Sequence, residues 1–305
     1  MSVPVKRVML GAVALVCVVV AYVWLGIPSR SRVRALAKTN PGETSVMRQR
    51  AREAEKAGRK ARPQQAWVPL SRISRHLVHA VLSSEDQKFF GHEGVDWEAI
   101  QKSFEEDRKK WRFSRGGSTI TQQLAKNLFF TTHKSLVRKL RELVAAHWLE
   151  ADLSKARILE LYLNVIEWGD GVYGAEAAAR RYYGKSAAGL TADEAAGLAG
   201  MIPNPRRINP RVNPAAFARA QRRVLWLMAN AGYLNRPGLG TTPPPPEPVE
   251  DDDEPPPEEP EASATPAEEA SPASEASPSP EAPPTPSAEP APEAPSPSPQ
   301  PSPFV

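Results

Sequence analysis

The sequence predicts an all-α protein with one folded domain, preceded by a single transmembrane helix and followed by a disordered tail. Three observations support this prediction. Twenty consecutive residues near the N-terminus carry no charge, apolar residues recur at helical intervals through residues 66–235, and residues 241–305 are dominated by proline, alanine, serine and acidic residues. The chain of 305 residues therefore leaves roughly 200 residues for the fold, enough for one well-buried domain.

The apolar run near the N-terminus covers residues 8–27. At about 1.5 Å per residue, a helix of this length spans about 30 Å, the thickness of the hydrocarbon core of a bilayer. The alternative is a cleavable signal peptide, whose apolar region usually has about 7–15 residues. Because the run is longer and no small-residue cleavage site follows it before Pro28, we expect an uncleaved anchor. Basic residues flank both of its ends, so the positive-inside rule leaves its orientation open.

The next part of the chain, residues 28–65, is a basic juxtamembrane segment whose stretch 47–62 is rich in helix formers. The domain proper is expected at residues 66–235. Apolar spacing and capping signals predict its helices over residues 71–84, over 134–151, onward from the N-cap Ser154, from the capping box at Thr191 to Pro203, and over 214–231.

The tail at residues 241–305 holds 23 of the 33 prolines and 15 acidic residues, but no Lys or Arg. Residues 1–240 therefore carry 39 basic against 20 acidic residues, a net charge of +19 that the whole-chain value of +4 conceals. A segment so poor in apolar residues cannot offset the entropy of ordering its backbone, so we expect disorder. Its role is open between a solvated spacer and an extended arm that reaches a partner.

Cysteine usage and missing motifs exclude several classes of protein. Cys17 is the only cysteine and lies in the apolar run, so the chain has neither a disulfide framework nor a Cys-based metal site. No SxxK or KTG motif is present, which excludes a penicillin-binding transpeptidase site.

The first cluster of functional interest is SSEDQKFFGHEG, in which Glu85 and Asp86 follow an apolar helix and precede Phe89 and His92. A carboxylate held in a cleft suits acid/base chemistry, because partial burial raises its pKa towards working pH. The alternative is an ordinary solvated helix end.

The second cluster is RGGSTITQQLAK at residues 115–126. Paired glycines ahead of a hydroxyl-rich helix start resemble an anion site, where unpaired N–H groups and the helix dipole favour phosphate, and Lys126 adds a charge. The spacing of a Walker loop is absent. An ordinary glycine turn with a Ser/Thr cap is the alternative.

The third cluster is basic: Lys134, Arg138 and Arg141 lie three or four residues apart, so they would line one side of a helix. With the glycine run, this set suits a clamp for a diphosphate. Glu142 lies four residues after Arg138, and the alternative for this pair is a surface ion pair.

The three clusters, in this order behind one anchor, resemble the peptidoglycan glycosyltransferases of glycosyltransferase family 51, and its monofunctional members in particular. The family signatures ED-x-x-F-x-x-H-x-G, GGSTI-x-QQ and RK-x-x-E are each matched, and a fourth, ILE-x-YLN, is matched by residues 158–164. The resemblance covers roughly residues 30–235 and implies a lysozyme-like, two-lobed α-helical glycosyltransferase domain.

The resemblance implies polymerisation of lipid II into β-1,4 glycan strands, with inversion at the donor sugar and release of undecaprenyl diphosphate. It assigns Glu85 as the general base and Glu142 as a second catalytic carboxylate. The substrate-binding residues that it implies are Asp86, Phe89, His92, Gly116, Gly117, Ser118, Thr119, Gln122, Gln123, Lys126, Lys134, Arg138, Lys139 and Arg141. Lys134 stands where many members have Arg, so it lacks the bidentate fork. A divalent cation, Mg or Mn, is implied, although no metal ligand set is identified from the sequence.

The resemblance also implies a place in the cell. Residues 1–7 would be cytoplasmic, residues 8–27 would cross the bacterial inner membrane once, and the catalytic domain and tail would be periplasmic. The expected partners are the membrane, lipid II, the growing strand and other cell-wall synthesis or division proteins, but not nucleic acid. The charges that flank the anchor do not follow the positive-inside rule, and we have no explanation for them.

Two rival functions remain at this point. One is a peptidoglycan-cleaving enzyme on the same fold, which would need one catalytic Glu but no diphosphate clamp. The other is an inactive membrane-tethered binding or scaffold protein, in which the basic body binds anionic lipid or nucleic acid. The cations and the GGSTI run weigh against the cleaving enzyme, while the presence of both Glu85 and Glu142 weighs against an inactive protein.

Overall fold

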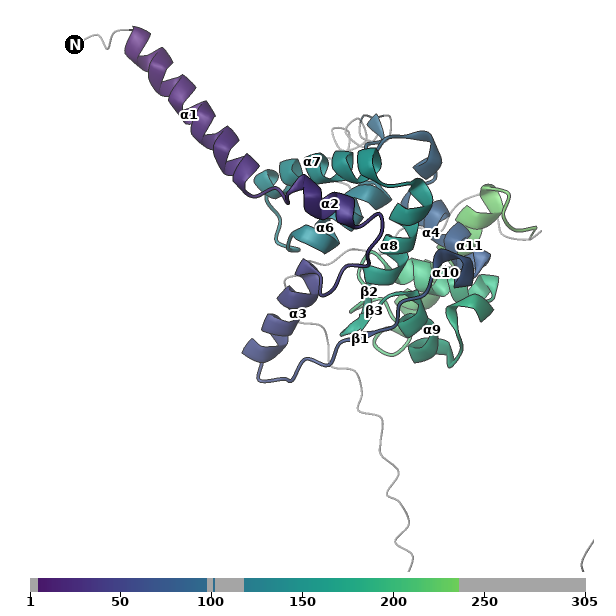
Figure 1. Ribbon diagram of the computed structural model, residues 1–305. Coiled ribbons are helices and arrows are strands. Elements are labelled where there is room, and N and C mark those ends of the chain that lie inside the picture. The colour runs from purple at the N-terminus through teal and green to yellow at the C-terminus, as the bar shows by residue number, and fades with distance from the viewer. Residues whose placement is uncertain (1–4, 98–100, 102–117, 236–305) are drawn as a thin grey trace, which may run out of the picture. The chain divides into compact units, whose positions relative to one another are not determined.

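The computed structural model describes residues 5–97, 101 and 118–235 (Figure 1). Helices dominate these residues, as the sequence predicts. The elements within residues 5–97 are α1 (Val5–Leu25), α2 (Arg30–Ala35), α3 (Ser45–Lys56), β1 (Gln64–Gln65), η1 (Leu70–Arg72), α4 (Arg75–Glu85) and η2 (Phe89–Gly91). Those within residues 118–235 are α6 (Ile120–Phe129), α7 (Leu136–Asp152), α8 (Lys155–Val165), β2 (Glu167–Gly169), β3 (Val172–Tyr173), α9 (Ala175–Tyr183), η3 (Ala187–Gly189), α10 (Ala192–Met201) and α11 (Pro214–Asn230).

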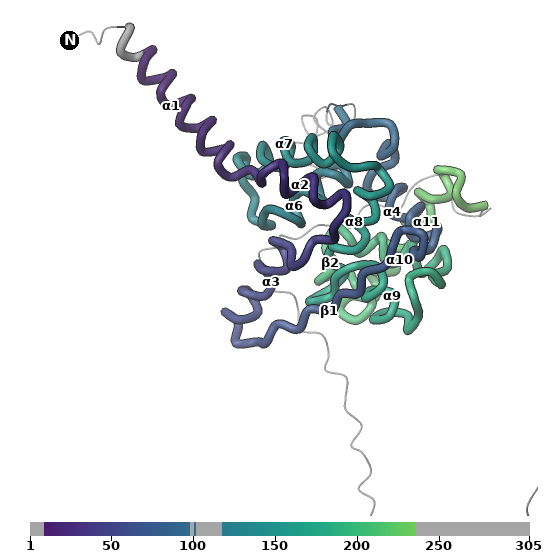
Figure 2. Tube along the Cα trace, viewed as in Figure 1, coloured from purple at the N-terminus to yellow at the C-terminus, as the bar shows by residue number. Residues whose placement is uncertain are grey.

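The helices pack in two groups that share one core. In the first group, α6 packs against α7 and α8, α3 lies on α6, and α2 lies along α7, as the trace in Figure 2 shows. In the second group, α10 packs against α11 and α4. Fully buried side chains from both groups, such as Leu77 of α4, Leu124 of α6 and Leu198 of α10, belong to a single hydrophobic cluster. The C-terminal end of α4 therefore meets the first group at the junction.

A small three-stranded sheet packs against α9. Its strand order is β1-β3-β2, with β1 parallel and β2 antiparallel to β3. Gly174 follows β3 with a φ of +81°, and a Cβ at this position would lie 2.7 Å from the backbone oxygen of Asn164. Only glycine fits this conformation and this approach, so the hairpin can pack directly on α8.

Local capping signals correctly predicted where α8 and α10 begin. Ser154 caps α8 by accepting from the N–H of Arg157, and Thr191 and Glu194 form the expected capping box of α10. Two other helices have boundaries that differ from those predicted by the spacing of apolar residues or by composition. The helix predicted from residue 71 begins at Arg75, because Ser74 is its N-cap, and the stretch predicted over 47–62 is helical only over α3.

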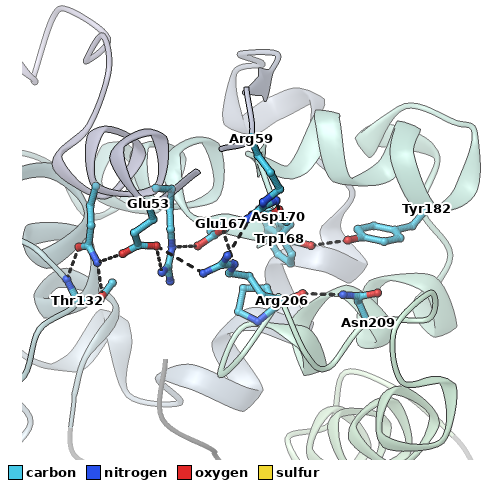
Figure 3. A network of polar contacts seen from close by, with 12 residues as sticks. Glu53, Arg59, Thr132, Glu167, Trp168, Asp170, Tyr182, Arg206 and Asn209 are labelled. Carbon is cyan, nitrogen blue, oxygen red and sulfur yellow. Dashed lines mark hydrogen bonds and ion pairs between the residues drawn. The ribbon is translucent and has the colours of Figure 1, made fainter. Parts of the chain in front are cut away.

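The basic segment 28–65 takes part in the fold. Val33 and Leu36 are buried in the main core, while Val46 and Met47 of α3 are buried as well. Arg50 of α3 donates to the carboxylate of Glu167 in the hairpin, and Glu167 belongs to the polar network shown in Figure 3. Packing of the folded unit therefore extends upstream of residue 66, to α2.

Helix α1 is long and apolar enough to cross a membrane. The described apolar side chains of residues 9–20 are exposed around the whole helix, whereas a surface helix of a globular domain buries one face. At its C-terminal end, Trp24 packs edge-on against Trp148 of α7, with ring centroids 6.1 Å apart.

Candidate active site

Glu85 is the last residue of α4 and lies where the two helix groups meet. The amide Nε2 of Gln123, on α6, donates a hydrogen bond to Glu85 Oε2 at 2.7 Å. Burial raises the pKa of Glu85 above its usual value, and the hydrogen bond from Gln123 and the charge of Lys126 oppose this shift. A half-buried carboxyl with a raised pKa that accepts a hydrogen bond from a glutamine has the properties of an acid/base group.

Asp86, next to Glu85, turns in the opposite direction and holds the local backbone together. Its carboxylate lies 2.9 Å from His92 Nε2 and accepts from the N–H of Ile120 at 3.0 Å. The Nδ1 of His92 accepts from the N–H of Gly94, so the ring proton resides on Nε2 and is donated to Asp86. Asp86 and His92 thus tie the loop after α4 to the first turn of α6.

Gly94 provides the next contact between this loop and α6. Its φ is +84°, and its carbonyl accepts from Thr119 Oγ1 at 2.7 Å and from Gln122 Nε2 at 3.3 Å. Thr119 also caps α6, because its hydroxyl accepts from the N–H of Gln122. The buried Thr119 and Gln122 therefore position the loop and the helix start.

Lys139 of α7 reaches across to the start of α6. Its Nζ donates to Ser118 Oγ and to Gln122 Oε1, both at 2.8 Å. Burial lowers the pKa of Lys139; the negative charge of Glu142 opposes this shift, while Arg138 and Lys126 add to it. The ammonium of Lys139 is thus held among other cations.

Glu142 is buried within the same basic group. Its carboxylate pairs with Arg138 and lies 3.7 Å from Lys139 Nζ. Lys126 of α6 interacts electrostatically with both Glu85 and Lys139. Three cations against the one carboxylate of Glu142 give this region a net positive charge, which suits an anionic ligand.

The remaining predicted residues lie elsewhere. Arg141 turns to the end of α1, where it donates to the carbonyl oxygens of Tyr22 and Val23. Phe89 is buried in the core beneath Lys155, and Lys134 is exposed ahead of α7. Gly116 and Gly117 lie outside the described residues.

Four residues that were not predicted as site residues support this site. Lys155 donates to the carbonyl of His92 at 2.5 Å and to Glu150 Oε1 at 2.8 Å, and Thr121 donates to the same carboxylate oxygen at 2.5 Å. The fourth is Tyr162 of α8, whose hydroxyl donates to Gln123 Oε1 at 2.9 Å. Tyr162 is the tyrosine of the ILE-x-YLN signature, but nothing in that motif shows that its hydroxyl contacts Gln123.

The described residues do not provide a metal site. Within 5–97 and 118–235, no group of three or more His, Cys, Asp or Glu could hold an ion. The carboxylate of Glu142 faces Arg138 and Lys139 instead. The Mg or Mn ion that the family resemblance implies therefore stays a prediction that no ligand set among these residues supports.

The fold and this arrangement of charged groups agree with comparisons to known proteins. Residues 51–229 match the family model described as Transglycosylase, so the chain belongs to the transglycosylase family. This family's domain is lysozyme-like, which confirms the predicted fold.

Relatives identify the kind of transglycosylase. The chain is 58% identical over 167 residues to the "Biosynthetic peptidoglycan transglycosylase" of Dechloromonas aromatica (strain RCB), which covers 55% of this chain and 72% of the relative. It is 48% identical over 192 residues to the protein of the same description from Herminiimonas arsenicoxydans, covering 63% of this chain and 83% of the relative. The predicted enzyme class, a peptidoglycan glycosyltransferase, is confirmed.

Proposed function

We propose that the enzyme polymerises lipid II into β-1,4 glycan strands and releases undecaprenyl diphosphate, with Glu85 as the general base. The observation that carries this proposal is the position of Glu85. Its carboxyl has a raised pKa and interacts electrostatically with Lys126. It accepts from Gln123 of α6, and the neighbouring Gln122 accepts from Lys139 of α7. A proton acceptor beside a cationic group is what transfer of a sugar from a diphosphate donor requires.

The proton transfer follows from the carboxylate geometry. Among the residues with described positions, only Gln123 donates to Glu85, and it does so at Oε2. In the proposed step, the Glu85 carboxylate accepts the proton of the acceptor sugar's 4-hydroxyl, whose oxygen forms a bond to the anomeric carbon of the donor. The bond from that carbon to the diphosphate breaks on the opposite face, so the α-linked donor becomes a β-linked product.

The cations stabilise the leaving group. Negative charge increases on the diphosphate as its bond to the sugar breaks, and fixed cations at that point lower the barrier. Lys126 of α6 and Lys139 of α7 supply the positive charge that stabilises the leaving diphosphate. Arg138 is paired with Glu142, which keeps its guanidinium in place at the same helix end. The role of Glu142 is therefore to orient and balance the cations.

The membrane places the enzyme beside its substrate. Helix α1 would anchor the chain in the inner membrane, and the donor and the growing strand carry lipid tails that lie in the same bilayer. We infer that the catalytic domain and the tail are periplasmic, where finished strands enter the wall and other cell-wall synthesis or division proteins can meet the tail.

The test uses the full chain in detergent with labelled lipid II, and the products are separated by size. We expect long glycan strands from the wild type and none from Glu85→Gln, whereas Glu43→Gln, at an exposed position, keeps full activity. Absence of polymer from the folded wild type would contradict the proposal. Digestion of finished glycan would instead establish the peptidoglycan-cleaving alternative.

A further inference from the structure

We propose that Tyr162 is a positioning residue for Glu85 and acts through the side-chain amide of Gln123. The inference rests on the proposed function of Glu85 as the general base. Tyr162 lies on α8, Gln123 on α6 and Glu85 on α4, so one row of polar groups connects three helices that the chain forms far apart in sequence.

The hydrogen bonds of this row have a fixed direction. Tyr162 donates its hydroxyl proton to Gln123 Oε1 at 2.9 Å, and Gln123 Nε2 donates to Glu85 Oε2 at 2.7 Å. Tyr162 is fully buried. Among the described residues, the hydrogen bonds of Tyr162 lead to the Glu85 carboxylate through Gln123.

The tyrosine hydroxyl selects one of two orientations of the Gln123 amide. Rotation of the amide by half a turn would place Oε1 against the ionised carboxylate of Glu85, so that two acceptors would face each other. Burial, together with the charges of Glu85 and Asp86, raises the pKa of Tyr162, which keeps its hydroxyl protonated and able to donate. Its bond to Oε1 therefore directs Nε2 to Glu85.

This orientation favours the ionised form of Glu85. A carboxylate accepts from Nε2, whereas a protonated Glu85 could donate to Oε1 if the amide were free to rotate. Without the tyrosine hydroxyl, both forms of Glu85 would find a partner, and the pKa of Glu85 would rise further. A larger fraction of the enzyme would then lack a working base at moderately acidic pH.

The test is the pH dependence of strand synthesis by Tyr162→Phe, measured as kcat and KM for lipid II. We expect the acidic limb of the kcat profile to move to higher pH. A shift of one pH unit corresponds to about a tenfold loss at pH values on that limb, with near wild-type kcat well above it. KM should not change, because Tyr162 is buried away from any substrate.

Two further variants make this test specific. Tyr182→Phe is the control, because it removes a tyrosine hydroxyl that donates to the carbonyl of Trp168 at 2.9 Å and not to Gln123. This variant should leave the acidic limb of the kcat profile in place. Gln123→Ala should move the limb in the same direction as Tyr162→Phe. The double variant, with both Tyr162→Phe and Gln123→Ala, should shift the acidic limb no further than Gln123→Ala alone, because both substitutions remove the same hydrogen bond.

The outcomes separate this inference from the proposed function. If Glu85→Gln polymerises lipid II, the assignment of the base fails. If Glu85→Gln is inactive but Tyr162→Phe is folded and keeps the wild-type profile, only the role of Tyr162 fails. A loss of equal size at every pH, with a lowered Tm, would show a purely structural role and would also overturn the inference.

Discussion

The guanidinium of Arg141 caps the membrane helix, because its Nε donates to the carbonyl oxygen of Val23 at 3.1 Å. Its Nη2 donates to the carbonyl of Tyr22 at 2.5 Å, and the guanidinium lies 4.8 Å from the centre of the Tyr22 ring. The last carbonyls of a helix have no partner within the helix, and a cation there also interacts favourably with the helix dipole. Arg141 directly precedes Glu142, so α7 both contacts the anchor α1 and carries Arg138 and Lys139 of the basic group.

Substitution of Gly26 separates two roles of Arg141. A Cβ on Gly26 would overlap the Arg141 guanidinium, so Gly26→Ala displaces this group but keeps its charge. The measurement is the distribution of distances between spin labels on Cys17 and on a cysteine introduced at the exposed Leu136. If the cap fixes α1 on α7, Arg141→Ala and Gly26→Ala should both broaden this distribution. Lys134→Ala is the control and should leave the distance narrow.

Activity measured on the same variants tests the diphosphate role of Arg141 that the family resemblance implies. In that case, Arg141→Ala should lose strand synthesis while Gly26→Ala keeps it, since the displaced guanidinium remains able to reach the substrate. Equal losses in both variants would assign the effect to the anchor contact instead.

The raised pKa of Glu85 predicts a stability effect opposite to its effect on activity. The folded state binds the proton of Glu85 more tightly than the unfolded state does, so this group's contribution to stability falls as pH rises through the raised pKa. Glu85→Gln should therefore be inactive yet have the same or a higher Tm at neutral pH. Thermal unfolding at pH 5 and pH 8 measures this difference, and a Tm that drops only at pH 8 would contradict it.

Lys139 predicts the alkaline side of the pH profile. Burial lowers the pKa of its ammonium, so Lys139 loses its charge at a lower pH than an ordinary lysine. Diphosphate binding should weaken there, and KM should rise at alkaline pH. Lys139→Arg keeps the charge at every accessible pH, so the rise in KM should move to higher pH. The planar guanidinium of arginine replaces the point charge of the lysine ammonium in this variant. An unmoved limb would exclude Lys139 as its source.

Asn164 predicts a large loss of stability outside the active site. Its fully buried amide donates to the carbonyl of Val68 at 2.9 Å and accepts from the N–H of Val68 at 3.0 Å. Asn164→Ala leaves both backbone groups without these partners and should cost about 2–4 kcal/mol of unfolding free energy. Denaturant titration measures the loss, and the exposed Asn230→Ala should cost less than about 0.5 kcal/mol.

The polar network in Figure 3 allows a second test of stability outside the active site. Glu167 accepts from Arg50 Nε at 3.0 Å, and Arg206 Nε lies 4.0 Å from its other carboxylate oxygen; all three side chains are buried. Glu167→Gln leaves two guanidinium groups with less negative charge around them and should cost about 3–5 kcal/mol. Glu55→Gln, exposed on the same helix as Arg50, should be nearly neutral.

The sequence by itself determined the features that depend on neighbours along the chain. The apolar run of α1, the N-cap Ser154 and the capping box at Thr191 are relations between residues no more than about four apart, or properties of one continuous segment. The order and spacing of the signature motifs were sufficient for the family. They also marked Glu85 and Gln123, although not the bond between them.

Only the tertiary structure decided where those side chains point. Helical spacing predicted that Arg141 would join Arg138 on one side, but its guanidinium donates instead to the carbonyl oxygens of Tyr22 and Val23 at the end of α1. The hydroxyl of Tyr162 acquires its role from Gln123, a residue 39 positions earlier, because α8 packs on α6. Such contacts depend on how whole helices pack, and packing is the sum of many buried surfaces that no local pattern contains.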